Sequence, residues 1–339
     1  MTTQTTSPRP LLELGTGFWA SKTLLSAVEL GLFTVLGTGP ATEEQVREKL
    51  GLHPRSTRDF LDALVALGVL EREGDLYANT PATALYLDEN QDGYLGGWMR
   101  QASSRLFLAW SGLTESLRTG RPTIGSDSQD YFRRLYENLD HRRAFISAMD
   151  AITNHIGPEL AGKLDWSRHR DILDVGGARG NLSAYLLREH ANLRCTVFDM
   201  PELRPLFDEH MAARDLTDRT DFVTGDFFAE PLPKADVLVF GHILHDWDVE
   251  QRRALLAKAF DAVRPGGMVV VYDRMIDDER RSNAVGLLGC LNLLLVTPGG
   301  SEYAVADCRR WVESAGFART EAYPLVDGLE TAVVGYRAH

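Results

Sequence analysis

The stretch DILDVGGARG at residues 171–180 decides the fold class of this chain. Its apolar beginning predicts a buried strand, and its glycines allow the backbone to turn sharply and approach a ligand in front of a helix. Beyond it, short apolar runs alternate with helical stretches, and the runs occupy residues 194–200, 220–227, 235–244 and 268–276. Strands that alternate with helices indicate a parallel, doubly wound sheet. We therefore expect an α/β, Rossmann-like fold.

The end of the chain departs from this alternation. Residues 319–338 contain two strand-like runs on either side of Asp327-Gly328, with no helix between them. This pattern predicts a β-hairpin. An antiparallel hairpin at the end of a parallel sheet distinguishes this chain from the ordinary dinucleotide-binding fold.

The first third of the chain is predicted to be mainly α-helical. We expect Thr42 to cap a helix that Gly51 ends, and Ser56 or Thr57 to cap the next helix. Residues 69–80 have apolar residues on both sides of a Gly-Asp turn, which indicates a short hairpin. Helix, turn, helix and hairpin is the order of elements in a winged helix.

These patterns divide the chain into three parts. We expect a winged-helix domain at residues 11–120, a helical connector at residues 121–165 and the α/β domain at residues 166–339. A length of 339 residues is typical of two domains.

The charge of the chain argues against two classes of partner. It carries 36 Lys and Arg against 48 Asp and Glu, a net charge of −12. The expected winged helix is itself acidic, with eight acids and five bases between residues 42 and 80. Phosphate backbones and anionic lipids attract basic surfaces. We therefore expect neither nucleic acid nor membrane as a partner, and we interpret the winged helix as an oligomerisation and substrate-covering domain.

Hydropathy and cysteine content bear on the compartment. The longest apolar run, residues 284–296, has thirteen residues and includes Asn292, whereas a membrane-spanning helix needs about twenty. The chain has three cysteines, Cys195, Cys290 and Cys308, and an odd and small number in a chain of this length does not indicate a disulfide framework. We expect a cytoplasmic protein.

The glycine turn differs from the dinucleotide-binding pattern. Its spacing is GGxxG, at Gly176, Gly177 and Gly180, and Asp174 precedes it. A carboxylate at this point would repel a pyrophosphate but could meet water or an ammonium group. Asp199 ends the second strand, nineteen positions after the last glycine, which suits hydrogen bonds to ribose hydroxyls.

The residues after the third strand point to adenine. Asp226 could accept a hydrogen bond from the adenine amino group, and Phe227 could cover the ring. An adenosine with an amino-acid end rather than a pyrophosphate indicates S-adenosylmethionine (SAM).

Six motifs in fixed order, DVGGARG, VFDMPEL, GDFF, LHDWDVEQ, RPGG and GGSEY, carry a family resemblance. The chain resembles, over nearly its whole length, class I SAM-dependent small-molecule O-methyltransferases with an N-terminal winged-helix dimerisation domain, both bacterial natural-product and plant caffeate-type enzymes. The resemblance implies a homodimer and SAM as cofactor. The cofactor-binding residues that we expect are Asp174, Gly176, Gly177, Gly180, Asp199, Met200, Asp226, Phe227 and His242.

His245, in the LHDWDVEQ motif after the fourth strand, is the candidate general base. Methyl transfer is an in-line displacement, and a hydroxyl nucleophile must lose its proton to a base. Histidine titrates nearest neutrality, and the resemblance gives this position that role. It also implies flanking carboxylates at Glu302 and at Asp273, where the family usually has the longer Glu. Asp248 is the expected N-cap of the next helix.

The acceptor is expected to be a small aromatic metabolite, because the candidate pocket residues are mainly apolar and aromatic. Asn292 could hydrogen-bond a phenolic or carbonyl oxygen, or it could bond local backbone. The expected substrate-binding residues are Phe145, Met149, Trp247, Asn292 and Leu295, with His155, Trp98 and Phe107 nearby.

A metal is not expected. His242, His245, Asp246 and Asp273 could assemble a site with two histidines and carboxylates. However, no histidine follows His245 until His339, and Asn292 stands where metal-binding relatives would have a second pocket histidine.

We therefore predict a SAM-dependent O-methyltransferase that acts on a phenolic or similar hydroxyl, as in antibiotic biosynthesis. A C-methyltransferase acting on a phenol or 2-oxo acid, a non-methylating SAM-binding relative and a winged-helix regulator are the alternatives.

Overall fold

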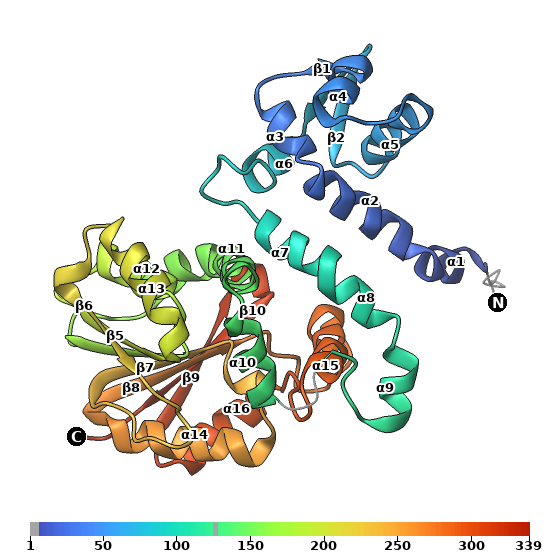
Figure 1. Cartoon of the computed structure of the whole chain (residues 1–339). Coiled ribbons are helices and arrows are strands. Elements are labelled where there is room, and N and C mark those ends of the chain that lie inside the picture. Colours follow the sequence, from blue (N-terminus) through green and yellow to red (C-terminus); the bar gives the residue numbers. More distant parts are fainter. Residues whose placement is uncertain (1–6, 125–127) are drawn as a thin grey trace, which may run out of the picture. The chain divides into compact units, whose positions relative to one another are not determined.

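The computed structural model describes residues 7–124 and 128–339 and is shown in Figure 1. The chain forms two compact units. One consists of the residues up to Phe107 together with Ser147–Ala151, and the other of Leu108–Ile146 and Ile152–His339.

The first unit packs helices around a small sheet. Its three strands have the order β1-β3-β2 and pair antiparallel. Its core includes the fully buried side chains of Leu32, Phe33, Val46, Leu61 and Leu64. The elements are α1 (Arg9–Gly15), α2 (Gly17–Glu29), α3 (Leu32–Gly37), β1 (Ala41–Thr42), α4 (Glu43–Leu50), α5 (Pro54–Ala66), β2 (Leu70–Glu73), β3 (Leu76–Asn79), α6 (Pro81–Tyr86), α7 (Gly96–Gln101) and a π-helical turn (Ala102–Leu106).

The local predictions for this unit are confirmed with one exception. Thr42 caps α4 in a capping box, in which its Oγ1 accepts from the Gln45 amide at 3.3 Å. The residues 69–80 form the predicted hairpin. The predicted start of α5 was wrong, because this helix begins at Pro54 and His53 caps it. Proline has no N–H and a helical φ, so it suits the first position of a helix and extends the helix beyond Ser56.

The second unit is built on a seven-stranded sheet with the order β6-β5-β4-β7-β8-β10-β9. The strands β4 (Asp171–Val175), β5 (Arg194–Asp199), β6 (Thr220–Thr224), β7 (Ala235–Gly241) and β8 (Val263–Asp273) are parallel. The predicted hairpin is confirmed, since β9 (Arg319–Leu325) and β10 (Glu330–Tyr336) pair antiparallel and β10 also pairs antiparallel with β8.

Helices cover both faces of this sheet, with α12 and α13 on one face and α14 and α16 on the other (Figure 1). The α/β fold class is therefore confirmed. The helices from α8 onward are α8 (Phe107–Trp110), α9 (Leu113–Thr119), α10 (Ser128–Glu137), α11 (Leu139–Lys163), α12 (Asn181–Glu189), α13 (Arg204–Ala212), α14 (Val249–Ala262), α15 (Ala284–Val296) and α16 (Val305–Ser314). Among the described residues, no helix has both the length and the apolar character needed to cross a bilayer.

The parallel strands bring their carboxyl ends to one edge of the sheet. In open α/β sheets, ligands bind at that edge. Four segments that are distant in sequence end there, at Val175, Asp199, Gly241 and Asp273. The fold thus brings together the glycine turn, Asp199 as the candidate ribose-binding carboxylate, and the turn that carries the candidate base His245.

The central strand β7 should be the most sensitive to truncation. Leu238 lies on β7 between β4 and β8 and is fully buried. We expect Leu238→Ala to lower the free energy of unfolding by about 2–5 kcal/mol, because it removes buried apolar contacts and leaves a cavity. Urea unfolding followed by circular dichroism measures the change. Val223→Ala on the edge strand β6, where the side chain is 37% exposed, is the control, and equal losses for both variants would contradict this account of the core.

Candidate active site

A cavity of about 350 Å³ opens at the carboxyl edge of the second unit's sheet. It brings together five of the predicted cofactor residues, namely Gly176, Asp199, Met200, Asp226 and Phe227. The remaining lining residues are Phe132, Arg133, Tyr136, Pro201, Thr224, Gly225, Phe228, Glu230, Ile243, Asp246 and Trp247.

The glycine turn after β4 needs its glycines for a steric reason. Gly176 has a φ of 73°, and a Cβ there would lie 2.2 Å from Ile243 Cδ1. Gly180 has a φ of 77° and caps the N-terminus of α12. The turn therefore presents bare backbone to the cavity at Gly176, in front of a helix N-terminus, where backbone N–H groups favour an anionic group.

The Asp174 side chain lies against this turn. Its carboxylate accepts a hydrogen bond from Ser183 Oγ at 2.8 Å, and a Cβ at Gly177 would lie 2.4 Å from its carboxyl carbon. Burial raises the pKa of Asp174 to about 6. Asp174, Gly177 and Gly180 do not line the cavity, so any role that they have toward a ligand acts through the turn.

Asp199 joins the turn to β5. Its Oδ2 accepts from the Ala178 amide at 2.8 Å and its Oδ1 from the Met200 amide at 2.7 Å. Burial raises the pKa of this carboxyl to about 7. Each carboxylate oxygen has a second lone pair, so Asp199 is oriented by the backbone and can still accept from hydroxyls in the cavity.

Aromatic rings form another part of the cavity wall. The Phe227 and Phe228 rings meet Trp247 edge to face, with centroids 5.7 Å and 4.6 Å from it. Asp226 is exposed, and its Oδ1 accepts from the Phe228 amide at 2.8 Å. Trp247, which we expected to contact the acceptor, thus lies beside the residue expected to cover adenine.

The lining fits the chemistry of SAM. A buried carboxylate suits the ribose hydroxyls, an exposed carboxylate and aromatic rings suit a purine, and a glycine turn before a helix suits the amino-acid end. Both Asp199 and Asp226 are needed for this pattern, and both line the cavity.

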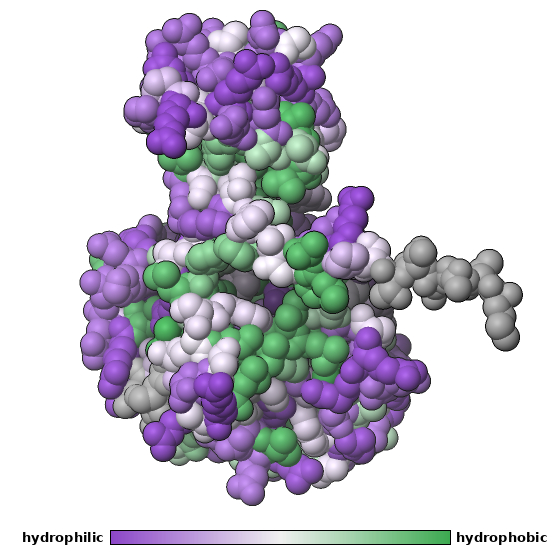
Figure 2. All heavy atoms as spheres, turned by 90° about the vertical axis from the view of Figure 1, so that its right-hand side faces the viewer, coloured by the Kyte–Doolittle hydropathy of each residue, from purple (hydrophilic) through white to green (hydrophobic). Residues whose placement is uncertain are grey.

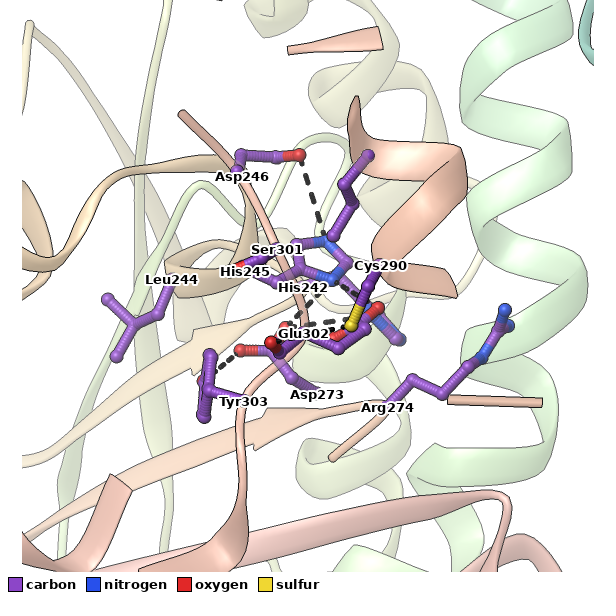
Figure 3. Close-up of polar contacts among 12 residues, drawn as sticks. His242, Leu244, His245, Asp246, Asp273, Arg274, Cys290, Ser301, Glu302 and Tyr303 are labelled. Atoms are coloured by element: carbon purple, nitrogen blue, oxygen red, sulfur yellow. Dashed lines mark hydrogen bonds and ion pairs between the residues drawn. The ribbon is translucent and has the colours of Figure 1, made fainter. Parts of the chain in front are cut away.

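His245 lies beside the two predicted carboxylates (Figure 3). It belongs to a short 3₁₀ turn, Leu244–Asp246, that follows β7. Its Nδ1 is 3.1 Å from Glu302 Oε1 and 3.5 Å from Asp273 Oδ1. The shorter side chain of Asp273 therefore still reaches the imidazole.

The surroundings of His245 stabilise its positive charge. Burial opposes that charge, but Glu302, Asp273 and Asp246 together raise the pKa of His245 to about 10. Burial in turn raises the pKa of Asp246 to about 6 and that of Asp273 to about 7. A pKa of about 10 keeps both ring nitrogens protonated at neutral pH when no ligand is bound. Because Nδ1 faces two carboxylates and keeps its hydrogen, Nε2 is the nitrogen that can lose its proton and then act as an acceptor. Nε2 lies 3.8 Å from Asp246 Oδ1, and Asp246 lines the cavity.

His242 lies beside His245, with ring centroids 5.4 Å apart, and neither histidine is among the residues that line the cavity. Its backbone is strained, with a φ of 54°. Its ring nitrogens are each 3.9 Å from a carboxylate oxygen, Nδ1 from Asp273 and Nε2 from Glu330. Burial and the neighbouring His245 hold the pKa of His242 well below its usual range. A cofactor-binding role for His242 stays a prediction.

His242, His245 and Asp273 also offer ligand atoms within 4.8 Å of one another. Two imidazoles and a carboxylate are a donor set that transition metals accept. The expectation that the chain uses no metal therefore requires a direct test.

The predicted acceptor residues are distributed over both units. In the second unit, Phe145 packs against the rings of Phe132 and Tyr136, and Asn292 accepts from Trp110 Nε1 at 3.2 Å. Asn292 is thus bonded to another side chain, not to local backbone. Leu295 is fully buried, and its carbonyl accepts from two amides of the 121–124 segment. His155 also belongs to the second unit, whereas Met149, Trp98 and Phe107 belong to the first.

Several residues of this region were not predicted. Phe132, Arg133 and Tyr136 of α10 line the cavity, and Tyr303 donates its hydroxyl hydrogen to Asp273. Tyr303 stands directly after Glu302 in GGSEY, so its motif could have indicated it. The residues of α10 follow from the helix register, which the polar sequence of the connector does not determine.

Comparisons with known proteins agree with this site. A family model described as an O-methyltransferase domain matches residues 110–318, and one described as an O-methyltransferase dimerisation domain matches residues 12–89. The chain is 49% identical over 336 residues to the tetracenomycin polyketide synthesis 8-O-methyl transferase TcmO of Streptomyces glaucescens, which covers 98% of both chains. It is 40% identical over 328 residues to the N,N-dimethyltransferase OxyT of Streptomyces rimosus, which covers 95% of each.

Solved structures agree as well. The human N-acetylserotonin methyltransferase, solved with SAM, superimposes with a TM-score of 0.90 at 26% identity and covers 100% of both chains. The mitomycin 7-O-methyltransferase MmcR has a TM-score of 0.82 at 28% identity and covers 97% of both chains.

The hydrogen bond to Glu302 should control the titration of His245. We expect Glu302→Gln to lower the pKa of His245 by about 1 to 2, because a neutral amide replaces a charged hydrogen-bond acceptor. Nuclear magnetic resonance of carbon-13-labelled histidine in the full chain measures this, with the signal assigned by His245→Gln. Glu250→Gln, at an exposed position on α14, is the control. An unchanged His245 titration in Glu302→Gln would contradict the contact.

Proposed function

The chain belongs to the SAM-dependent O-methyltransferases that carry an N-terminal dimerisation domain, and we propose that it methylates a phenolic hydroxyl of an aromatic polyketide with His245 as the general base. The acceptor class rests on the 49% identity to an enzyme of tetracenomycin polyketide synthesis. The role of His245 rests on one observation, which is that its Nδ1 faces Glu302 and Asp273. From this we infer that Nε2 is the nitrogen that exchanges a proton with the acceptor.

The proposed reaction divides between the cofactor and the chain. SAM supplies an electrophilic methyl group on a positively charged sulfonium, and this charge disfavours a second cation close by. His245 Nε2 accepts the hydroxyl proton as the oxygen becomes the nucleophile. Glu302 and Asp273 then stabilise the imidazolium, as a carboxylate does for the histidine of a hydrolase triad.

The residues that we propose to hold SAM are those of the cavity and its turn. Asp199 accepts from the ribose hydroxyls, Met200 lies beside it, and Asp226 and Phe227 hold adenine. Gly176 lets the backbone approach the amino-acid end, with Asp174, Gly177 and Gly180 fixing the turn.

An amine acceptor is the second candidate. Four carboxylates, of Asp246, Asp273, Glu302 and Glu330, surround the two histidines. Such a site would also stabilise an ammonium product, and the 40% identical relative is named as an N,N-dimethyltransferase. Nuclear magnetic resonance of the isolated product distinguishes oxygen, nitrogen and carbon methylation.

We further propose that the chain is divided into domains at residues 11–120, 121–165 and 166–339, as the sequence predicts. We also propose that it forms a homodimer through the first of these, the N-terminal domain. Helices α1 and α2 expose large apolar side chains, including Leu11, Leu14 and Trp19, which are 75%, 81% and 64% exposed. Apolar side chains, in green, gather on the face of the molecule in Figure 2. Exposed apolar side chains of this size indicate an interaction surface.

Light scattering tests the dimer. We expect the purified chain at micromolar concentration to have about twice the mass of its 37.7 kDa chain. Replacing Leu11, Leu14 and Trp19 with Ser should shift the mass toward the monomer. A wild-type monomer, or a dimer that these changes leave intact, would contradict the proposed interface.

His245→Gln tests the proposed base. We expect its kcat toward a hydroxyaromatic acceptor to fall at least about 100-fold, because a glutamine amide does not take up the proton. Its affinity for SAM, measured by calorimetry, should stay within about twofold of wild type. Unchanged turnover would refute the mechanism without affecting the family assignment.

Asp199→Asn is the matched control for His245→Gln, because it should weaken SAM binding instead of proton transfer. We expect it to weaken SAM binding by about 10-fold or more, because an amide replaces a charged acceptor.

The use of a metal is tested by repeating the turnover assay of the wild-type chain with a chelator. Retained turnover would support metal-free catalysis, and lost turnover would point to a metal at His242, His245 and Asp273.

A further inference from the structure

Arg252 is a buried cation next to the catalytic region that the proposed mechanism does not use. It lies on α14 and is only 1% exposed. We propose that Arg252 is a positioning residue that holds the His245 turn and the Glu302 segment in the geometry needed for proton transfer. The inference rests on the proposed function of His245 as general base.

The contacts of Arg252 join two segments that are distant in sequence. Its Nε donates to the Leu244 carbonyl at 2.8 Å, and its Nη2 lies 3.4 Å from the His245 carbonyl. The same Nη2 donates to the Ser301 carbonyl at 2.6 Å and to Ser301 Oγ at 3.2 Å. A backbone bond from the Ser301 amide to the His245 carbonyl, at 2.8 Å, closes the link between the two segments.

The partners of Arg252 explain why the residue is arginine. They are carbonyl oxygens, a hydroxyl and the rings of Tyr303 and Trp311, whose centroids lie 4.7 Å and 5.3 Å from the guanidinium carbon. A guanidinium is planar, carries several donors in a rigid fork and stacks on aromatic faces, whereas a lysine ammonium is a point charge on a flexible stem. Only the fork can bond both segments while its face rests on a ring.

Each segment that Arg252 touches carries a group acting on the imidazole. Leu244 and Ser301 directly precede His245 and Glu302 in sequence, and Tyr303 donates its hydroxyl hydrogen to Asp273. The 3.1 Å contact between His245 Nδ1 and Glu302 therefore joins two loops, and Arg252 hydrogen-bonds to both of them. Without these hydrogen bonds each loop could move, and a displacement of about 1 Å can lower a reaction rate about 100-fold.

Arg252→Lys keeps the charge and removes the fork. We expect kcat/KM to fall about 10- to 100-fold, while the affinity for SAM stays within about twofold. The groups that face His245 are Glu302, Asp273, Asp246 and His242, with Glu330 behind His242. Because Glu302 would align less well, the acidic limb of the pH–rate profile should move to lower pH by about one unit.

A merely structural role gives a different result. It would lower the amount of active enzyme but leave the pH limb in place. Arg253→Lys is the control, since Arg253 is the exposed neighbour on the same helix, and it should match wild type. The proposal would be overturned if Arg252→Lys had wild-type turnover, or if it lost turnover while the acidic limb of its pH–rate profile stayed at the wild-type pH.

A second variant covers the case in which Arg252→Lys does not fold. Ser301→Ala keeps Arg252 and deletes one of its acceptors. We expect kcat/KM to fall about 3-fold and the acidic limb of the pH–rate profile to move to lower pH, as for Arg252→Lys. Unchanged turnover and an unchanged limb would contradict the proposal.

The titration of His245 separates this inference from the proposed function. Nuclear magnetic resonance reports its pKa in the full chain without turnover, and Arg252→Lys should lower it. If wild type methylates no hydroxyaromatic, the proposed function fails while this readout still tests the positioning. If wild type is active and the titration is unmoved, the inference alone fails.

Discussion

The hydrogen bond between His245 Nδ1 and Glu302 Oε1 joins residues 57 positions apart, and the proposed chemistry of the site depends on it. β7 leads into the turn that carries His245, whereas Glu302 follows α15 and is brought back to the same edge by the Ile276–Ala304 bridge and by the bond from the Ser301 amide to the His245 carbonyl. Asp273, at the end of β8, adds a second carboxylate 3.5 Å from the same ring nitrogen. The topology thus decides where a histidine can be held by two acids.

The same edge carries an unusual concentration of buried acids. Asp199 and Asp174, both buried, lie on the cofactor side, and the buried Asp273 and Glu330 lie around the histidines with the half-buried Asp246. Burial raises the pKa of each of these five carboxyl groups. Such groups are costly to bury without compensation. Hydrogen bonds, the imidazolium and the buried guanidinium of Arg252 provide part of it, and a cationic ligand would add to it.

Much of this arrangement could be predicted from the sequence because it depends on local patterns. The apolar runs gave the strands, the spacing of Gly176, Gly177 and Gly180 gave the turn, and Thr42 and Asp248 cap the predicted helices. The caps depend on side chains that reach only three residues, so the sequence contains all the information.

What the sequence did not reveal depends on long-range packing. The family resemblance implied Asp273 beside His245, but only the register of β8 shows that its shorter side chain still reaches the imidazole, and the cavity residues of α10 follow from how that helix docks. Arg252 reads as an ordinary surface residue in an amphipathic helix, and only the fold buries it. His53 was missed because proline at the first position outweighed the better capping residues that follow.

The central claim is that His245 takes the acceptor's proton through Nε2. A crystal structure of the full chain with S-adenosylhomocysteine and a hydroxyaromatic acceptor tests this most directly. The account predicts the acceptor oxygen about 3 Å from His245 Nε2, with Nδ1 still bonded to Glu302. An acceptor oxygen held by another side chain, with Nε2 turned away from it, would contradict the account.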